Sequence, residues 1–357
     1  MTRSADQNQT NAELELSVIV PARNEELSLP ACLASLVRQS EPGFELGRQW
    51  ELIVVNDDST DRTAEIAAEF AARHAGITIM ASPLLDSAGT VTGKNNACWA
   101  AAQAAQGHWL LFTDADTVHE QGDLSRSLRE AERHQAALLS YSPRQIVTGF
   151  WQRAVMPVIF SELASVYRMA EVNDPDRPLA AANGQFLLIE RSAYFAVGGH
   201  RAVAADVLED VALARIVKQS KRNLRFRYAP DALSTRMYRT TAQMIEGWTK
   251  NLAVLFPRPI YLAAWRALDL ALYFGLPLLA FGISWLVPWQ RAALMLLWGR
   301  TLWRFYARVA RSNFPPMEIA LSILGVPLLI YLLVSSTIQH RIRRRVAWKG
   351  RSYRTHV

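Results

Sequence analysis

Two carboxylates one residue apart, Asp114 and Asp116, follow the apolar run Trp109–Thr113. A pair of acids on a turn can hold one Mg²⁺ or Mn²⁺ ion, with diphosphate oxygens and water completing the coordination shell. Such an ion would offset the charge that grows on a leaving diphosphate. Short acidic turns are common, so the pair alone is a weak signal. Its position directly after a buried strand favours a metal site.

Polar residues also end two earlier apolar runs. The run Trp50–Asp58 ends in Asp57 and Asp58, either of which could accept a hydrogen bond from the N3–H of a uracil ring. The alternative is a turn that caps the next helix. The first run, Leu16–Ala22, leads into a polar turn that would border the same pocket, and the alternative is an ordinary loop. The residues of that turn are Pro21, Ala22, Arg23, Asn24 and Glu25.

Lys94 opens an expected helix over residues 94–106, where a cation opposes the helix macrodipole. That local cost suggests that Lys94 meets an anion such as diphosphate, although a solvated lysine is the alternative. Arg236 follows the last expected strand and could close over the same diphosphate or join a basic and aromatic belt beside a membrane. The other members of that set are Arg239, Trp248 and Lys250.

Glu209 and Asp210 precede an apolar helical run. One of them could act as a general base that deprotonates an acceptor hydroxyl. Acids also favour the first turn of a helix, and spacing alone favours this second interpretation.

The elements that must position these residues alternate along the chain. Four apolar runs read as buried parallel strands, and the first three are followed by helices over 29–39, 61–75 and 94–106. The pattern predicts an α/β fold, in which ligands bind at the carboxyl ends of the strands. The four strands are Leu16–Ala22, Trp50–Asp58, Ile77–Ser82 and Trp109–Thr113. Later strands are expected at Ala136–Ser142, Gln185–Ile189 and Leu224–Tyr228, with helices over 151–170 and 208–219.

The C-terminal part differs in composition. Leu270–Trp289 and Ile319–Ile338 each hold 20 residues without a charge. Each is long enough to cross the roughly 30 Å core of a bilayer, and a buried pair of core helices is the alternative. The intervening segment carries Arg300, Arg304 and Arg308 on one helix face, so it could lie at the interface, with the first apolar stretch re-entering the membrane rather than crossing it.

Charge and termini complete this picture. The tail 339–357 holds seven basic residues and no acid, which equals the whole net charge of +7. A near-neutral remainder argues against nucleic-acid binding. The tail favours anionic lipid headgroups, or is simply solvated. Residues 1–15 are polar and expected to be disordered, with no signal peptide. Two lone cysteines, Cys32 and Cys98, indicate neither a disulfide framework nor a zinc site. No dinucleotide or P-loop motif is present in the sequence.

Taken together, these motifs resemble family 2 glycosyltransferases with the GT-A fold, a Rossmann-like and mostly parallel α/β domain. The resemblance covers about residues 16–255 and rests on motifs that occur in the family's order: VIVPARNEE (18–26), VVNDDSTDRT (54–63), GKNNA (93–97), TDAD (113–116), VGGH (197–200) and LEDVAL (208–213). Two apolar spans and the sequence WKGRSY (348–353) are similar to a membrane branch that includes hopanoid-biosynthesis and carotenoid-acid glycosyltransferases.

The resemblance implies roles for the matching residues. Asp57 would contact the base, Asp114 and Asp116 would hold the donor with Asp116 on the metal, and Asp210 would be the base of an inverting displacement. The family's Asp-Asp-Gly is Asn56-Asp57-Asp58 here, which leaves the choice between the two acids open. The Gln-x-x-Arg-Trp motif of processive synthases is missing, which argues for one sugar per acceptor.

The expected protein is therefore an enzyme of the cytoplasmic membrane. A cytoplasmic catalytic domain (16–255) would transfer a sugar from a nucleotide-sugar, such as a UDP-sugar, to a lipid or lipid-like acceptor. A multi-pass membrane region (256–338) and a basic cytoplasmic tail would follow. The alternatives are a nucleotidyltransferase that makes sugar nucleotides and an inactive membrane partner of a lipid pathway.

Overall fold

The computed structural model describes residues 14–84, 92–206, 208–348 and 351–354. They form two compact units, and each unit is discontinuous in sequence. The first unit comprises Met1–Arg144 and Ala170–Thr235, and the second comprises Gln145–Met169 and Arg236–Val357. The N-terminal segment expected to be disordered, 1–15, lies outside the described residues except for its last two.

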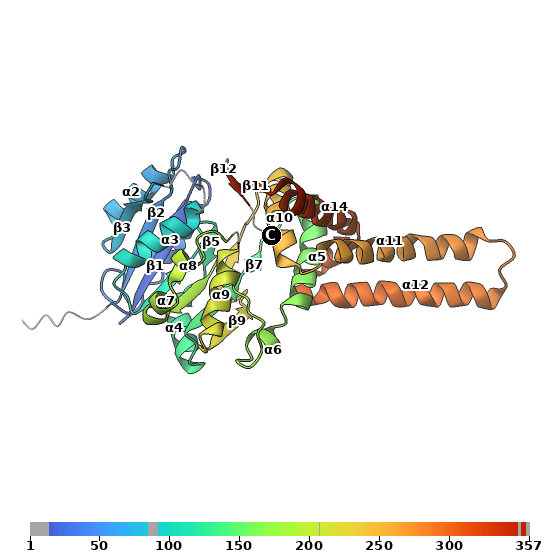
Figure 1. Ribbon diagram of the computed structural model, residues 1–357, viewed down its shortest axis with the longest axis horizontal. Coiled ribbons are helices and arrows are strands. Elements are labelled where there is room, and N and C mark those ends of the chain that lie inside the picture. The colour runs from blue at the N-terminus through green and yellow to red at the C-terminus, as the bar shows by residue number, and fades with distance from the viewer. Residues whose placement is uncertain (1–13, 85–91, 207, 349–350, 355–357) are drawn as a thin grey trace, which may run out of the picture. The chain divides into compact units, whose positions relative to one another are not determined.

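A seven-stranded sheet in the order β3-β2-β1-β4-β8-β6-β9 forms the centre of the first unit (Figure 1). β1 pairs in parallel with β2 and β4, and β8 is antiparallel to both of its neighbours. The predicted α/β fold with a mostly parallel sheet is therefore confirmed. The strands are β1 (Leu16–Ala22), β2 (Trp50–Asn56), β3 (Ile77–Ala81), β4 (Trp109–Phe112), β6 (Leu138–Ser142), β8 (Leu187–Glu190) and β9 (Leu224–Tyr228).

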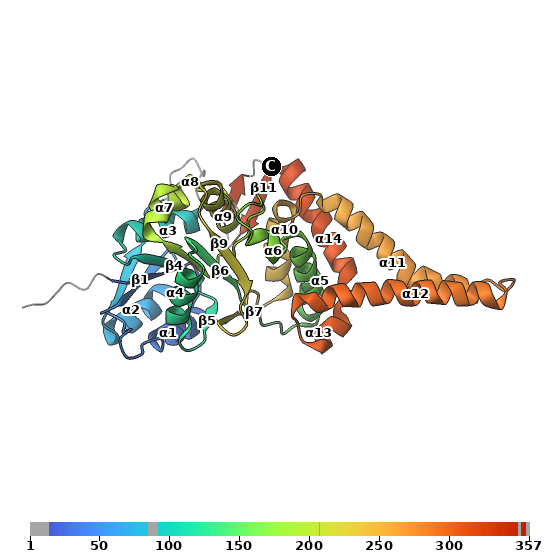
Figure 2. The same ribbon diagram turned by 90° about the horizontal axis from the view of Figure 1, so that it is seen from below.

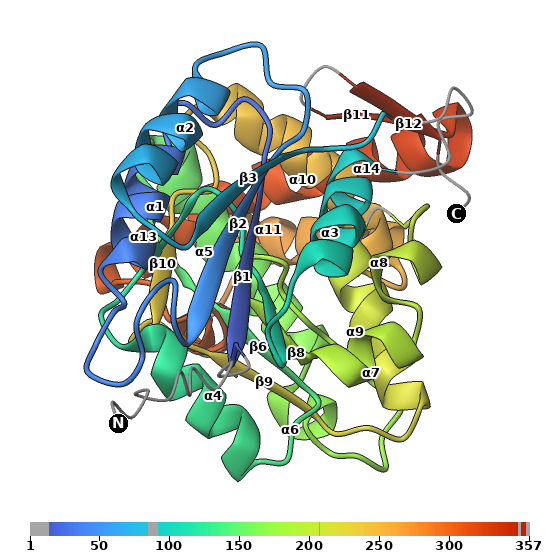
Figure 3. The same cartoon turned by 90° about the vertical axis from the view of Figure 1, so that its left-hand side faces the viewer.

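Helices cover both faces of this sheet (Figure 3). One face carries α1 (Leu29–Val37), α2 (Thr63–Arg73) and α4 (Asp123–Arg133). The other carries α3 (Gly93–Ala104), α7 (Arg191–Ala196), α8 (Gly199–Ala202) and α9 (Glu209–Gln219). Because both faces are covered, strand residues such as Val18, Ile19 and Val54 are fully buried. This is why the strands read as unbroken apolar runs.

A small second sheet lies in the order β5-β10-β7. Its strands are β5 (Thr117–His119), β10 (Leu233–Thr235) and β7 (Arg144–Gln145). β5 and β10 pair antiparallel, so Thr235 lies opposite Thr117. This pairing joins the end of the first unit to the residues that follow Asp116.

The second unit is helical, with a core of its own. Its helices are α5 (Phe150–Val166), α10 (Thr241–Leu255), α11 (Pro259–Gly282), α12 (Pro288–Val309), α13 (Pro316–Leu321) and α14 (Val326–Thr337). Val155, Val158 and Ile159 of α5 are fully buried. The helix expected over 151–170 therefore contributes to the core of this unit.

Two helical stretches are long and apolar enough to cross a membrane, by length and composition: Pro259–Gly282 and Pro316–Arg343. The first predicted span, 270–289, has different helix bounds, because α11 ends at Gly282 and α12 begins at Pro288. The turn between them is itself apolar, so composition alone does not reveal it. α11 and α12 run side by side as an antiparallel hairpin (Figures 1 and 2).

The predicted basic tail contains regular structure. A helical segment, Ile338–Arg343, is followed by the strands β11 (Arg345–Trp348) and β12 (Arg351–Arg354), which pair antiparallel.

Candidate active site

The sheet places the polar turns together because its strand order reverses at β1. β2 lies on one side of β1 and β4 on the other, so the carboxyl ends of these strands border one crevice. Pro21–Glu25 follows β1, Asp57 follows β2 and Asp114 follows β4.

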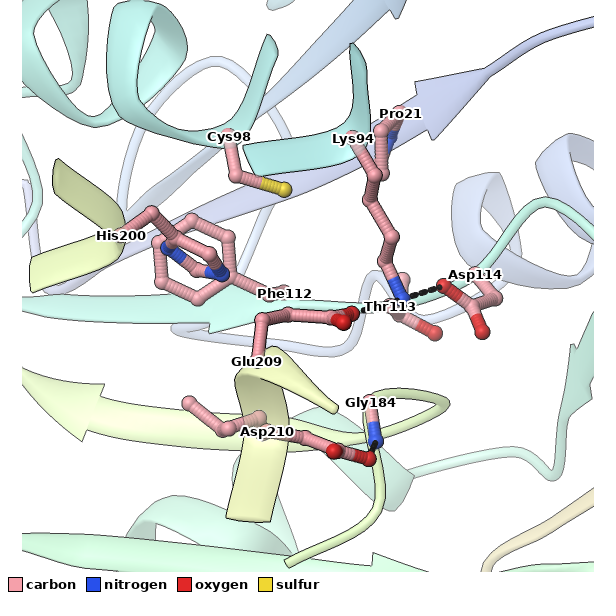
Figure 4. Close-up of a pocket in the computed structure, with 11 residues that line it drawn as sticks. Pro21, Lys94, Cys98, Phe112, Thr113, Asp114, Gly184, His200, Glu209 and Asp210 are labelled. Carbon is pink, nitrogen blue, oxygen red and sulfur yellow. Dashed lines mark hydrogen bonds and ion pairs between the residues drawn. The ribbon is translucent and has the colours of Figure 1, made fainter. Parts of the chain in front are cut away.

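A pocket in this region collects acids and a lysine from three segments of the first unit (Figure 4). Lys94 comes from α3, Asp114 from the end of β4, and Glu209 and Asp210 from the start of α9. The remaining lining residues are Pro21, Cys98, Phe112, Thr113, Gly184, Leu187 and His200. Lys94, Asp114 and Asp210 are thus brought together, although more than a hundred residues separate the first from the last.

The Lys94 ammonium lies between two carboxylates. Its Nζ is 2.7 Å from Asp114 Oδ1 and 2.8 Å from Glu209 Oε1. Burial lowers the pKa of Lys94, but the charges of Asp114 and Glu209 outweigh it, and the pKa of Lys94 is raised well above its usual value. Lys94 therefore remains a cation at neutral pH, suited to meeting a diphosphate.

Asp210 lies at the N-terminus of α9, and two backbone amides hold its carboxylate. Gly184 N–H donates to Oδ2 and Val211 N–H donates to Oδ1, each at 2.8 Å. Burial and the charge of the neighbouring Glu209 raise the pKa of Asp210 to about 6, against the opposing effects of Lys94 and the two amides. A carboxylate with a raised pKa, fixed in a pocket, is suited to act as a general base near neutral pH.

Gly184 was not singled out from the sequence, and the geometry explains why a glycine stands there. A Cβ atom at this position would lie 2.9 Å from Lys94 Nζ and 3.5 Å from Asp210 Oδ2. His200 was also given no pocket role. His200 is buried, and burial lowers its pKa to about 4, so its imidazole is neutral at pH 7. In the sequence, neither a glycine ahead of a strand nor a histidine after two glycines indicates a pocket residue.

Hydrogen bonds join the turns that follow β1 and β2. Arg23 Nη1 donates to the carbonyl oxygens of Asp57 and Asp58, at 2.7 and 2.9 Å. Asn24 Oδ1 accepts from Thr60 N–H at 2.9 Å. Asp57 is only 6% exposed, whereas the Asp58 side chain is 82% exposed and its backbone adopts a left-handed φ of 54°. Asp57 is thus the acid that the fold encloses.

The Asp114–Asp116 turn is a candidate metal site. Its two carboxylates are the hard oxygen ligands that Mg²⁺ and Mn²⁺ prefer. Within 14–84, 92–206, 208–348 and 351–354, however, no three acidic, histidine or cysteine side chains form a group that could hold an ion. The turn therefore fits a divalent cation only if oxygens of a bound ligand, such as a diphosphate, complete the coordination shell.

Arg236 belongs to the second unit, where its Nη2 donates to Thr148 Oγ1 at 3.2 Å. Its expected contact with the diphosphate stays a prediction. Trp248 is buried in the core of the same unit, so it packs as a core residue rather than as part of an exposed belt.

Comparison with known proteins identifies the family. The family model described as "Glycosyl transferase family 2" matches residues 17–197. The 4,4'-diaponeurosporenoate glycosyltransferase of Staphylococcus haemolyticus is 31% identical over 243 residues, which cover 67% of this chain and 61% of the relative. The enzyme of the same name from Staphylococcus aureus (strain USA300) is 28% identical over 246 residues, covering 67% and 60%. The match thus spans less than two thirds of these relatives.

A solved structure shares the fold. The mannosyltransferase PcManGT from Pyrobaculum calidifontis, in complex with GDP-Man and Mn²⁺, aligns over 92% of this chain and 88% of its own, with a TM-score of 0.54 and 16% identity. The resemblance drawn from the motifs is confirmed, both in its family and in its likeness to glycosyltransferases that are named for a carotenoid acid.

Proposed function

Because the chain belongs to glycosyl transferase family 2, we propose that it transfers a single sugar from a nucleotide-sugar, such as a UDP-sugar, to a lipid or lipid-like acceptor, with inversion at the anomeric carbon. One observation carries the proposal. The partly buried Asp210 carboxylate, whose pKa is raised, lines the same pocket as Lys94 and Asp114. A base and a diphosphate-binding cation in one pocket are what a single displacement requires.

In this mechanism Asp210 removes the proton from an acceptor hydroxyl as the oxygen attacks the anomeric carbon. The bond from that carbon to the phosphate oxygen breaks, and the nucleoside diphosphate leaves. The amides of Gly184 and Val211 hold the carboxylate in place for this proton transfer, because each anchors one of its oxygens. Burial is the main cause that keeps the pKa of Asp210 near 6, which suits a general base at neutral pH.

The donor would be held along the crevice. Asp57 would accept from the base, and the turn Pro21–Glu25 would border the nucleoside. Lys94 would exchange its acidic partners for the diphosphate, and Arg236 would add a second cation. Asp114 and Asp116 would hold a Mg²⁺ or Mn²⁺ ion, which neutralises charge on the leaving group when bound.

A membrane location would supply the acceptor. The α11–α12 hairpin supports it, since Phe281 and Trp285 are 71% and 80% exposed. The relatives are named for a carotenoid acid, which is itself a lipid-like acceptor. We place the catalytic domain on the cytoplasmic face of the membrane, anchored through the helices that follow it.

The test is the variant Asp210→Asn, which keeps the shape of the side chain but cannot take the proton. Transfer from UDP-sugars to a lipid extract, in detergent with Mn²⁺, is expected to fall about 10²- to 10⁴-fold. Affinity for UDP should change little. Glu69→Gln, an exposed change of the same charge on α2, is the matched control. Full activity in Asp210→Asn would rule out this assignment of the base.

A further inference from the structure

A chain of buried polar side chains lies behind the Asp114–Asp116 turn, and the mechanism above does not use it. His119 and Asp123 have side chains that are 0% and 1% exposed, and His119 Nδ1 is 2.8 Å from Asp123 Oδ2. On the other side of the imidazole, Nε2 is 3.0 Å from Thr113 Oγ1. Thr113 Oγ1 in turn lies 2.9 Å from Thr117 Oγ1. The chain therefore runs from α4 to the two threonines that flank the acidic turn.

Both threonine hydroxyls also lie against backbone carbonyls. Thr117 Oγ1 donates to the carbonyl oxygen of Asp114 at 2.7 Å, and Thr113 Oγ1 lies 2.8 Å from the carbonyl oxygen of Gln185. The His119 imidazole contacts Thr113 through Nε2, and Thr113 contacts Thr117. The buried pair therefore supports both threonines.

The far end of this chain is anchored in the core. Ser35 Oγ accepts from His119 N–H at 3.0 Å, and Gln39 Oε1 accepts from Asp123 N–H at 3.0 Å. Ser35 lies on α1 and Gln39 lies just after its C-terminal end, so the pair is tied to a core helix and the turn that follows it. On the other side of the turn, Thr235 Oγ1 donates to the carbonyl oxygen of Asp116 at 3.2 Å. The backbone of both acids is therefore held from buried positions.

Stability alone is a weak reason for such a chain. Replacing a buried ion pair by apolar side chains of similar volume is often neutral or stabilising. Holding ligand side chains within about 0.5 Å of a productive geometry, by contrast, depends on the residues behind them. We propose that His119 and Asp123 are positioning residues that hold the Asp114–Asp116 turn in the conformation that binds the metal and diphosphate of the donor. This inference rests on the proposed function.

The test removes the polar pair as a unit. In His119→Leu/Asp123→Leu the chain becomes apolar, and no buried charge is left behind. Calorimetric titrations with UDP and with GDP, each in MnCl₂ and in EDTA, separate the metal-dependent part of nucleotide affinity from the rest. We expect the metal-dependent part to fall about 10- to 100-fold, as for other outer-shell changes. Nucleotide affinity in EDTA should stay unchanged, because Asp57 does not belong to this row of hydrogen-bonded side chains.

Three variants complete the design. His119→Gln keeps a polar group that can hydrogen-bond to Thr113 and should restore most of the metal-dependent affinity. Thr117→Val removes the bond to the Asp114 carbonyl and the contacts of the hydroxyl with Thr113 and His119, so it should repeat the loss even if the double variant does not fold. Tyr141→Phe deletes a hydrogen bond of the mostly buried Tyr141 to Glu130, away from the turn, and should change neither titration.

The outcomes are distinguishable. A folded double variant, or Thr117→Val, that keeps the full gain in affinity from Mn²⁺ overturns the positioning role. A wild-type protein that binds neither UDP nor GDP contradicts the proposed function first, and the positioning role with it.

Discussion

Two adjacent acids at the end of β2 have different surroundings, and this difference predicts different roles. Asp57 is enclosed, and Asp58 projects outward. We expect Asp57→Asn to weaken UDP binding about five- to tenfold, because a neutral hydrogen bond replaces a charge-assisted one to the uracil N3–H. Asp58→Asn should leave affinity unchanged, since asparagine also tolerates the left-handed backbone there. Calorimetric titration of both variants with UDP is the measurement. Equal losses of affinity would contradict the assignment of Asp57 as the base contact.

The pH dependence of transfer follows from the pKa of Asp210. The carboxyl acts as a base only when ionised, so kcat should fall as pH drops through about 6. Glu209 raises the pKa of Asp210 by its charge. Glu209→Gln should therefore move the acid limb of the profile to lower pH. A profile of kcat against pH for both proteins is the measurement, and a limb that stays in place or moves upward would argue against Asp210 as the titrating base.

At the scale of elements, Gly325 allows the segment before α14 to lie close against α5. A Cβ atom on Gly325 would lie 2.4 Å from the carbonyl carbon of Ala154, so the two backbones touch. We expect Gly325→Ala to destabilise the second unit by about 1–3 kcal/mol through overpacking. Gly275→Ala, in open space on α11, should be neutral or stabilise it by about 0.5–1 kcal/mol. Thermal unfolding of both variants in detergent is the measurement, and equal shifts of Tm would contradict the close contact at Gly325.

The elements also show what sequence patterns can and cannot predict. β1 and the start of β2 were predicted correctly, because a strand buried on both faces leaves an unbroken apolar run. β5 and β10 are three residues long, and their pairing is set by partners distant in sequence. The antiparallel direction of β8 has the same non-local origin. Asp114 and Lys94 were found because they end or begin elements, whereas Gly184 lies in an irregular segment and was missed.

At the scale of the whole molecule, we expect the α11–α12 hairpin to enter the bilayer. Leu278 and Trp285 are 72% and 80% exposed, and water would solvate such a surface poorly. Ser284→Cys in the turn should react with a membrane-impermeant maleimide, added from the cytoplasmic side, only after detergent is added. Ala72→Cys on α2 is the control and should react at once.

The native thiols of Cys32 and Cys98 are buried, so their background reaction should be low. Equal labelling of Ser284→Cys and Ala72→Cys in intact vesicles would show that the hairpin stays in water.

The interleaving of the two units has a consequence for synthesis. α5 belongs to the second unit, yet the chain returns to the first unit before α10–α14 are made. On the ribosome, Val155, Val158 and Ile159 therefore emerge well before the helices that will cover them. A nascent apolar helix in this state is prone to aggregate. We therefore expect nascent chains of this protein to need a chaperone, or early delivery to a lipid surface, until the last helix has been released.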